Sequence, residues 1–432
     1  MYRNALADLD KWKSSAGRKP LILRGARQVG KTWLMKEFGE KNYPKVAYIN
    51  FEGNERMRNL FQNDFNLQRI LTGLQIEAGA TIDAETLIIF DEIQEVPNAL
   101  TSLKYFQENT SQYQILAAGS MLGVALNDGV SFPVGKVDFL DLHPLSFIEF
   151  LKAAGNDALV GLLDNNDISL ITSFKTTFID LLKKYYFVGG MPEAVITFTE
   201  SGDFKRVRAV QHRLLQAYEQ DFSKHAPSEV VPRIRQVWNS LPAQLSRENR
   251  KFVYGVIKQG ARAREYEMAL QWLLDSGLIH KTYRVSKPEI PLKAYRDPNA
   301  FKLFIVDVGL LGALSELDEV SLLEGSKVFT QFKGALTEQF VHQQIVIESI
   351  EPCYWSADKG TAEVDFVVQR GGKVYPIEVK AAENLQAKSL KNYFQQFKPQ
   401  KSVRTSMSDY RDEGWLLNLP LYMINQLGSY LQ

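Results

Sequence analysis

The sequence predicts an α/β protein: a doubly wound parallel sheet, followed by a helical region and a second, smaller α/β region. Strand and helix patterns alternate through about the first 150 residues, as they do in a doubly wound sheet. A glycine-rich segment separates the first expected strand, residues 21–23, from the first expected long helix, residues 32–41. Near the C-terminus, strand patterns at 363–368 and 374–380 flank a Gly-Gly turn, which predicts a β-hairpin.

The glycine-rich segment, Leu21-Ile-Leu-Arg-Gly-Ala-Arg-Gln-Val-Gly-Lys-Thr32, has the spacing of a phosphate-binding loop. Gly25 and Gly30 allow the backbone to turn so that successive N–H groups face an anion. Lys31 adds a charge for the terminal phosphates, Thr32 offers a hydroxyl to Mg²⁺, and the helix N-terminus faces the same phosphates. The bland alternative is a turn with a solvated lysine. The expected cofactors are ATP and Mg²⁺, and the expected nucleotide-binding residues are Gly25, Ala26, Arg27, Gln28, Val29, Gly30, Lys31, Thr32 and Trp33.

Polar residues follow two of the expected buried strands. Asp91 and Glu92 come directly after the apolar run 87–90, and Ser120 ends the strand pattern that starts at Tyr113. Since open α/β sheets bind ligands at the C-terminal ends of their strands, Asp91 is expected to hold Mg²⁺ and Glu92 to orient the attacking water. Ser120 is expected to contact the γ-phosphate or the water, or else to cap a helix from residue 121. Lys31, Glu92 and Ser120 are thus the catalytic candidates of this first site.

Composition excludes several classes of protein. The 432 residues are 45% apolar and 23% charged, which is ordinary for a globular chain of two to four domains. A single cysteine, Cys353, excludes an intrachain disulfide framework, and five scattered histidines do not predict a metal site. No run approaches the ~20 apolar residues of a membrane span and the N-terminus lacks a signal-peptide core, so a cytoplasmic location without membrane contact is expected. The net charge of +1 leaves nucleic-acid binding open.

Four short motifs occur in order along the chain: Arg24-Gly-Ala-Arg-Gln-Val-Gly-Lys-Thr32, Phe90-Asp-Glu-Ile-Gln94, Ala118-Gly-Ser120 and His143-Pro-Leu-Ser-Phe-x-Glu149. Together they resemble the prokaryotic AAA-type ATPases that are fused to a domain of unknown function designated DUF4143. The resemblance implies a P-loop AAA-type ATPase domain over residues 1–155. Lys136 stands where this family usually has an arginine, and a lysine there would supply charge without the fork geometry of a guanidinium.

The middle of the chain is expected to be mostly helical. Residues 156–228 predict a helical linker or lid, interrupted by the turn Val188-Gly-Gly-Met-Pro192, which also resembles the family but is interpreted as a plain turn before a helix. Three short helices and a strand over 229–310 suggest a winged helix. Basic residues Lys258, Arg262 and Arg264 lie where its third helix would start, which predicts DNA contact, a solvated face or a protein-docking face.

A second cluster of chemically capable residues lies toward the C-terminus. Glu338 falls on a helical pattern, Asp365 on a strand, and Glu378 and Lys380 on the next strand, where they share a face. Carboxylates suit Mg²⁺, and a lysine can activate water for phosphodiester hydrolysis. This arrangement resembles the PD-(D/E)xK nuclease core, which implies Glu338, Asp365 and Glu378 as metal ligands and Lys380 as a catalytic residue. The alternative is the solvated face of an antiparallel sheet.

The nuclease-like domain is expected over 311–400 and a tail that packs on the body over 401–432, with residues 402–413 as a loop. The predicted function is a Mg²⁺-dependent ATPase coupled to a DNA-binding, nuclease-like C-terminal region. The alternative is a non-catalytic switch whose ATP occupancy gates protein partners, with the C-terminal region as a scaffold. A protein partner or a homo-oligomer is compatible with either function.

Overall fold

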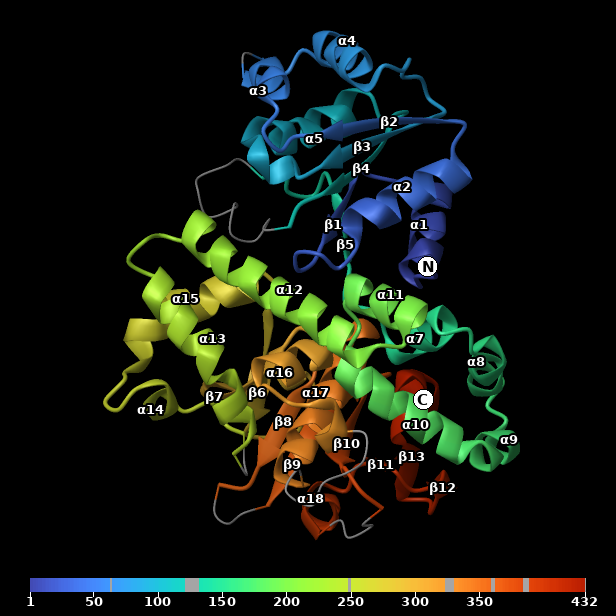
Figure 1. The fold of residues 1–432 in the computed structure, drawn as a ribbon, viewed down its shortest axis with the longest axis vertical. Coiled ribbons are helices and arrows are strands. Elements are labelled where there is room, and N and C mark those ends of the chain that lie inside the picture. Colours follow the sequence, from blue (N-terminus) through green and yellow to red (C-terminus); the bar gives the residue numbers. More distant parts are fainter. Residues whose placement is uncertain are drawn as a thin grey trace. The chain divides into compact units, whose positions relative to one another are not determined.

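The computed structural model describes residues 1–62, 64–120, 132–247, 250–322, 330–358, 362–383 and 388–431. The chain forms two compact units, traced in Figure 1. One comprises Met1–His143 with the short segment Asp275–Leu278, and the other comprises Pro144–Leu274 with Ile279–Gln432.

The first unit is built on a five-stranded parallel sheet in the order β2-β3-β4-β1-β5. This is the doubly wound sheet that the alternating pattern predicts. Its elements are α1 (Ala5–Ser14), β1 (Leu21–Arg24), α2 (Lys31–Asn42), β2 (Lys45–Asn50), α3 (Glu55–Gln62), α4 (Leu67–Ala78), β3 (Thr86–Asp91), the 3₁₀ turn η1 (Ile93–Glu95), α5 (Pro97–Asn109), β4 (Gln114–Ala118) and β5 (Asp138–Asp141).

Both faces of this sheet are covered, which explains why its central strands are apolar throughout. On one face, Ile88 and Phe90 of β3 pack with side chains of α3, α4 and α5. The alternate residues of β3, Leu87 and Ile89, are also fully buried, although they point to the opposite face. Every strand of this sheet runs in the same direction, so all C-terminal ends meet at one edge. That edge therefore collects the polar residues that follow the strands.

The second unit begins with a helical region, as predicted. Its helices are α7 (Phe147–Ala153), α8 (Asp157–Asp164), α9 (Ile168–Ser173), α10 (Lys175–Val188), α11 (Pro192–Ser201), α12 (Phe204–His225), α13 (Val231–Leu245), α14 (Tyr254–Ile257) and α15 (Ala263–Asp275). Ser146 and Glu149 of the His143–Glu149 motif form a capping box: each side chain bonds to the other residue's backbone N–H, which starts α7. This motif therefore has a structural role.

The Gly-Gly turn before α11 packs against two other segments of the second unit. A Cβ on Gly189 would lie 2.1 Å from Oδ1 of Asp307, and one on Gly190 would lie 2.1 Å from the carbonyl oxygen of Leu145. The N–H of Gly190 donates to Asp307 Oδ2 over 2.6 Å. Burial raises the pKa of Asp307, although three backbone N–H groups and Gln343 oppose the shift by donating to the carboxylate. Close packing thus accounts for both glycines.

The rest of the second unit is a mixed eight-stranded sheet in the order β12-β13-β11-β10-β9-β8-β6-β7. Its elements are β6 (Ile279–Val285), η2 (Leu292–Tyr295), β7 (Arg296–Ile305), α16 (Val308–Leu314), α17 (Thr330–Ile347), β8 (Cys353–Ser356), β9 (Glu363–Arg370), β10 (Lys373–Val379), α18 (Lys388–Phe397), β11 (Ser402–Ser406), β12 (Arg411–Asp412), β13 (Leu416–Pro420), η5 (Leu421–Gln426) and α19 (Leu427–Tyr430).

This one sheet spans three of the regions that the sequence predicted as separate. The helices expected for a winged helix are present as α13, α14 and α15, but β6 and β7 pair with each other and β6 continues into the sheet through β8. The predicted boundaries at 310 and 400 therefore fall inside the sheet. The loop prediction for 402–413 is wrong at its start, because Ser402–Ser406 is the fully buried strand β11, which pairs in parallel with β10 and β13.

Among the helices that the structure describes, none is long and apolar enough to cross a membrane.

Candidate functional site

The glycine-rich loop turns between β1 and α2, as the phosphate-binding motif requires. Gly25 and Gly30 have φ angles of 146° and 95°, and Gln28 also lies in the left-handed region at 67°. Gly25 has no room for a side chain, because a Cβ there would lie 2.1 Å from the carbonyl oxygen of Leu142. Helix α2 starts at Lys31, so the N-terminal end of its dipole faces the loop. The backbone therefore has the turns that the phosphate-binding motif requires.

Lys31 is buried within this loop, with only 6% of the residue exposed. Its Nζ donates to the carbonyl oxygens of Gly25 and Ala26, each over 2.9 Å. Burial lowers the pKa of Lys31 to about 8, although the carboxylates of Glu92 and Asp91 act in the opposite direction. The lysine is therefore not a solvated surface group, and its role in binding phosphate stays a prediction.

Asp91 ends β3 at the same edge of the sheet and is buried, with 4% of the residue exposed. Its Oδ2 accepts a hydrogen bond from the Tyr48 hydroxyl over 2.8 Å, and its Oδ1 accepts one from the N–H of Glu92 over 3.2 Å. Burial, followed by the bond to Asp91, raises the pKa of Tyr48, so the tyrosine acts as a donor. A fixed carboxylate beside the loop is a suitable ligand for Mg²⁺, together with the Thr32 hydroxyl. The residues present thus fit the ion that the fold implies.

Glu92 lies immediately after β3 and adopts a left-handed backbone conformation, with φ of 50°. Its Oε2 accepts two hydrogen bonds, from the Ser120 hydroxyl over 2.9 Å and from the Gln94 amide over 2.7 Å. The structure thereby brings together the ends of β3 and β4, which are neighbours in the sheet. The alternative role for Ser120, capping a helix from residue 121, falls on residues 121–131, outside the described part of the chain.

Two neighbours of this site were not predicted. Gln94 belongs to the motif Phe90–Gln94, but the sequence assigned it no role. Its contact with Glu92 depends on the 3₁₀ turn after β3. Gly277 lies in the short segment that clusters with the first unit, where a Cβ would come within 3.2 Å of the N atom of Ala26. No sequence signal near residue 277 indicates this proximity.

Lys136, which replaces the family's usual arginine, forms an ion pair with Glu108 over 2.9 Å.

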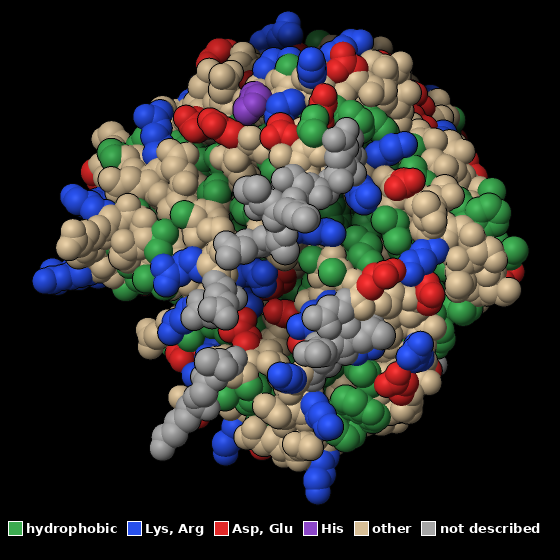
Figure 2. Space-filling model, turned by 60° about the horizontal axis from the view of Figure 1, so that its bottom comes forward, with side chains coloured by type: hydrophobic (Ala, Val, Ile, Leu, Met, Phe, Trp, Pro, Cys, Tyr) green, Lys and Arg blue, Asp and Glu red, His purple; other side chains and the backbone are tan. Residues whose placement is uncertain are grey.

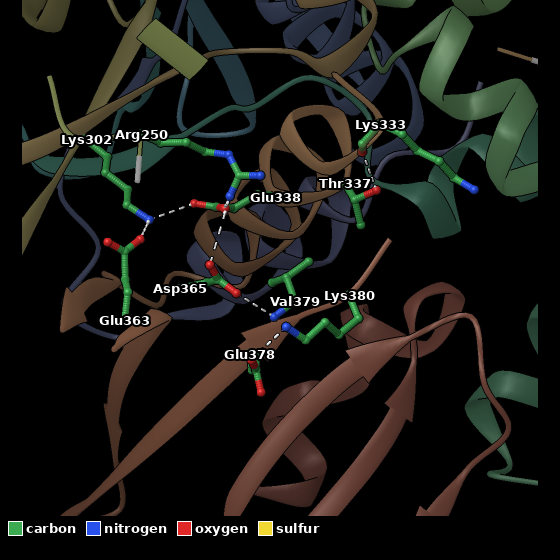
Figure 3. A network of polar contacts seen from close by, with 10 residues as sticks. All are labelled: Arg250, Lys302, Lys333, Thr337, Glu338, Glu363, Asp365, Glu378, Val379 and Lys380. Atoms are coloured by element: carbon green, nitrogen blue, oxygen red, sulfur yellow. Dashed lines mark hydrogen bonds and ion pairs between the residues drawn. The ribbon is translucent and has the colours of Figure 1, made fainter. Parts of the chain in front are cut away.

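The predicted C-terminal site lies in the second unit (Figure 3). Glu338 comes from α17, Asp365 from β9 and Glu378 from β10, so three elements place carboxylates in one network. The antiparallel pairing of Ile377 with Phe366 sets Glu378 opposite Asp365, as the hairpin prediction required. Lys380 follows β10 and its Nζ lies 2.8 Å from Glu378 Oε1.

Cations of the protein itself occupy much of this network. Lys302 of β7, whose side chain is fully buried, contacts Oε1 of Glu338 over 3.0 Å and Oε1 of Glu363 over 2.6 Å. Arg250 bonds to Oε2 of Glu338, and its Nη1 lies 4.0 Å from Oδ1 of Asp365 (Figure 3). Burial raises the pKa of Glu363, and Lys302 opposes that shift. Two basic side chains thus neutralise the carboxylates that a divalent ion would need.

The remaining oxygens do not converge on a common point. Asp365 Oδ2 accepts a hydrogen bond from the N–H of Val379 over 2.7 Å, and burial raises the pKa of Glu378, with Lys380 opposing the shift. Within the described ranges, no three His, Cys, Asp or Glu side chains are grouped so that they could hold a metal ion. As it is arranged here, the network does not fit a divalent ion, and the metal roles of Glu338, Asp365 and Glu378 stay a prediction.

The parallel sheet, the glycine-bent loop after β1 and the buried lysine at the start of α2 define the first unit as a P-loop nucleoside-triphosphatase fold. Residues 17–151 match a family described as AAA domain, and residues 333–422 match the domain of unknown function DUF4143. The chain therefore carries an AAA domain joined to a DUF4143 domain, the combination that the sequence predicted. Residues 179–321, between them, match a further domain of unknown function, DUF8612.

Similar solved structures include the Walker-type ATPase paby2304 of Pyrococcus abyssi, at 16% identity and a TM-score of 0.45, covering 72% of this chain and 95% of that one. The ORC1 protein of Aeropyrum pernix in complex with DNA matches at 13% identity and a TM-score of 0.28, covering 73% and 93%. The RuvB Holliday junction branch migration motor of Thermotoga maritima matches at 14% and 0.29, covering 67% and 90%. No curated protein sequence matches the chain.

Proposed function

We propose that this protein is a Mg²⁺-dependent ATPase whose catalytic centre lies at the C-terminal edge of the parallel sheet in the first unit. One observation carries the proposal: Glu92 and Ser120, from the ends of two neighbouring strands, are hydrogen-bonded to each other beside a loop that buries Lys31. Phosphoryl transfer needs positioned charge more than covalent chemistry from the protein, and these residues supply it.

Each residue has a distinct role in this proposal. The N–H groups of the loop and the charge of Lys31 bind the phosphates, while Thr32 and Asp91 would hold Mg²⁺, which would supply positive charge to the phosphates. Glu92 orients a water for attack on the γ-phosphorus. A bond forms between the water oxygen and phosphorus, the bond to the bridging oxygen of ADP breaks, and the water proton passes to Glu92 and then to solvent. Ser120 keeps the Glu92 carboxylate in place.

Two variants test binding and hydrolysis separately. Lys31→Ala removes the buried charge and should abolish ATP binding, measured by titration with a fluorescent ATP analogue. Glu92→Gln keeps the size of the side chain and should retain binding while phosphate release falls by at least about 100-fold. Normal nucleotide affinity in Lys31→Ala would refute the placement of the phosphates.

The rival proposal is a switch that binds ATP without hydrolysing it. The same pair of variants discriminates the two, because a switch requires Lys31 but not Glu92. Tight ATP retention without phosphate release in the wild-type protein would favour the switch, and so would equal behaviour of the wild type and Glu92→Gln.

DNA binding and Mg²⁺-dependent cleavage by the second unit remain predictions from the sequence. Lys258, Arg262 and Arg264 are exposed, so they are available for contact with DNA. However, on the face that Figure 2 shows, Lys and Arg side chains are interspersed with Asp and Glu, and such mixing is also typical of an ordinary solvated surface. A cleavage assay with Mg²⁺ or Mn²⁺ on single- and double-stranded DNA, with Asp365→Ala and Lys380→Ala as variants, tests this prediction; unchanged cleavage in both would exclude these residues.

A further inference from the structure

Gln94 is the residue of the first site whose role the motif does not explain. It lies in η1, the single 3₁₀ turn that follows Glu92. The left-handed conformation of Glu92 reverses the backbone there, so the side chains of residues 92 and 94 meet although they are only two positions apart. This conformation is strained for a residue other than glycine. The strained turn thus brings Gln94 into hydrogen-bond contact with Glu92.

The orientation of the Gln94 amide follows from its neighbour. Because a carboxylate only accepts hydrogen bonds, the amide must point its NH₂ group at Glu92, over 2.7 Å. In this orientation Oε1 of Gln94 is buried and has no hydrogen-bond partner among the described residues. An unsatisfied buried carbonyl oxygen costs free energy. The bond to Glu92 therefore forms although it leaves Oε1 of Gln94 unsatisfied.

Both donors use the same oxygen of Glu92. Ser120 and Gln94 each bond to Oε2, and no hydrogen bond to Oε1 is found in the part of the chain that the structure describes. Two donors fix the rotation of the carboxylate and leave Oε1 as the oxygen that can accept a hydrogen bond from water.

We propose that Gln94 is a positioning residue for hydrolysis: together with Ser120 it holds Oε2 of Glu92 so that Oε1 is presented to the attacking water. This inference rests on the proposed ATPase function and extends it to a residue that touches neither the nucleotide nor the water. Removal of one of two charge-assisted donors should slow hydrolysis by roughly 10-fold, and nucleotide binding should not change.

The experiment compares three variants of the full-length protein. Gln94→Met keeps the length of the side chain and removes the donor, and Ser120→Ala removes the other donor. Gln112→Met is the matched control, because Gln112 is exposed in a turn before β4. Phosphate release gives kcat, and titration with a fluorescent ATP analogue gives Kd. Gln94→Met and Ser120→Ala should each lower kcat by about 10-fold with Kd within twofold, whereas Gln112→Met should change neither quantity.

A double variant separates positioning from general structural damage. If Gln94 acts through Glu92, Gln94→Met should cause no further loss in a Glu92→Ala background, measured in single turnovers with labelled ATP. A kcat within twofold of wild type in Gln94→Met, or an equal loss in both backgrounds, would overturn the proposal. If the methionine variant does not fold, Gln94→Asn is measured instead and should show the same loss, because its shorter amide falls short of Glu92. A wild-type protein without turnover would overturn the ATPase function itself.

Discussion

Nucleotide affinity should fall as the pH rises above about 8, because the lysine that binds the phosphates loses its charge. Burial lowers the pKa of Lys31 to about 8, from an ordinary value of 10.5. At pH 8 about half of the molecules carry the charge and at pH 9 roughly one in ten does, so the Kd for ATP should rise by up to about 5-fold between pH 8 and pH 9. This figure is an upper limit because it assumes that only the charged lysine binds the phosphates.

The pH dependence of stability should have the opposite sign. Since the pKa of Lys31 is lower in the folded protein than in the unfolded chain, the folded state favours the neutral amine. The contribution of Lys31 to the free energy of unfolding should therefore increase from pH 8 to pH 10.5, by on the order of 3 kcal/mol in the nucleotide-free protein. Loss of the Lys31 proton should thus weaken ATP binding and, in the nucleotide-free protein, stabilise the fold.

The assay is a titration with a fluorescent ATP analogue at saturating Mg²⁺ from pH 6.5 to 9.5, with Lys31→Arg as the control. A guanidinium keeps its charge through this range, so its Kd curve should be flat between pH 8 and 9 even if its affinity is lower. An equal rise of Kd in Lys31→Arg would assign the pH dependence to another group. A flat curve for the wild type would refute the claim that Lys31 is buried enough to titrate near pH 8.

Three further predictions concern the loop, the ionic network and the metal. Gly25→Ala should lower the melting temperature and abolish ATP binding, because a Cβ would lie 2.1 Å from the carbonyl oxygen of Leu142; normal binding by a folded variant would contradict this geometry. Arg250→Ala removes one of the cations that contact buried Glu338, so the free energy of unfolding, measured by urea denaturation, should fall by about 3 kcal/mol. The control Lys251→Ala, at an exposed position, should have no effect. EDTA should stop phosphate release, and Mg²⁺ should restore it; turnover without a divalent ion would exclude the roles of the proposed metal ligands.

Much of the first site could be predicted because its residues are close together in the sequence or follow strands. The loop from Gly25 to Thr32 is one continuous segment, so its spacing alone indicates its backbone geometry. Asp91 and Glu92 could be placed because parallel strands deliver their C-terminal ends to one edge. Gln94 lies in the motif Phe90–Gln94, but its role depends on the left-handed backbone conformation of Glu92. The sequence pattern does not indicate that conformation.

The second unit shows where such prediction ends. The hairpin register that sets Asp365 opposite Glu378 follows from strand alternation, so these residues were correctly expected to be neighbours. The basic partners of Glu338 could not be found in this way, because Lys302 is 36 positions away and Arg250 is 88 positions away. A list of carboxylates in order along the chain resembles a metal site whether or not lysine and arginine side chains fill it.

The sequence by itself determined the P-loop and the alternation of strands and helices in the first unit. These features depend on local spacing and periodicity, which the order of residues records directly. Only the tertiary structure decided that β6 and β7 share a sheet with β8 to β13, and that Arg250 and Lys302 neutralise the acidic cluster. Strand partners and the counter-ions of buried charges are chosen by packing between distant segments, and distance along the chain does not encode them.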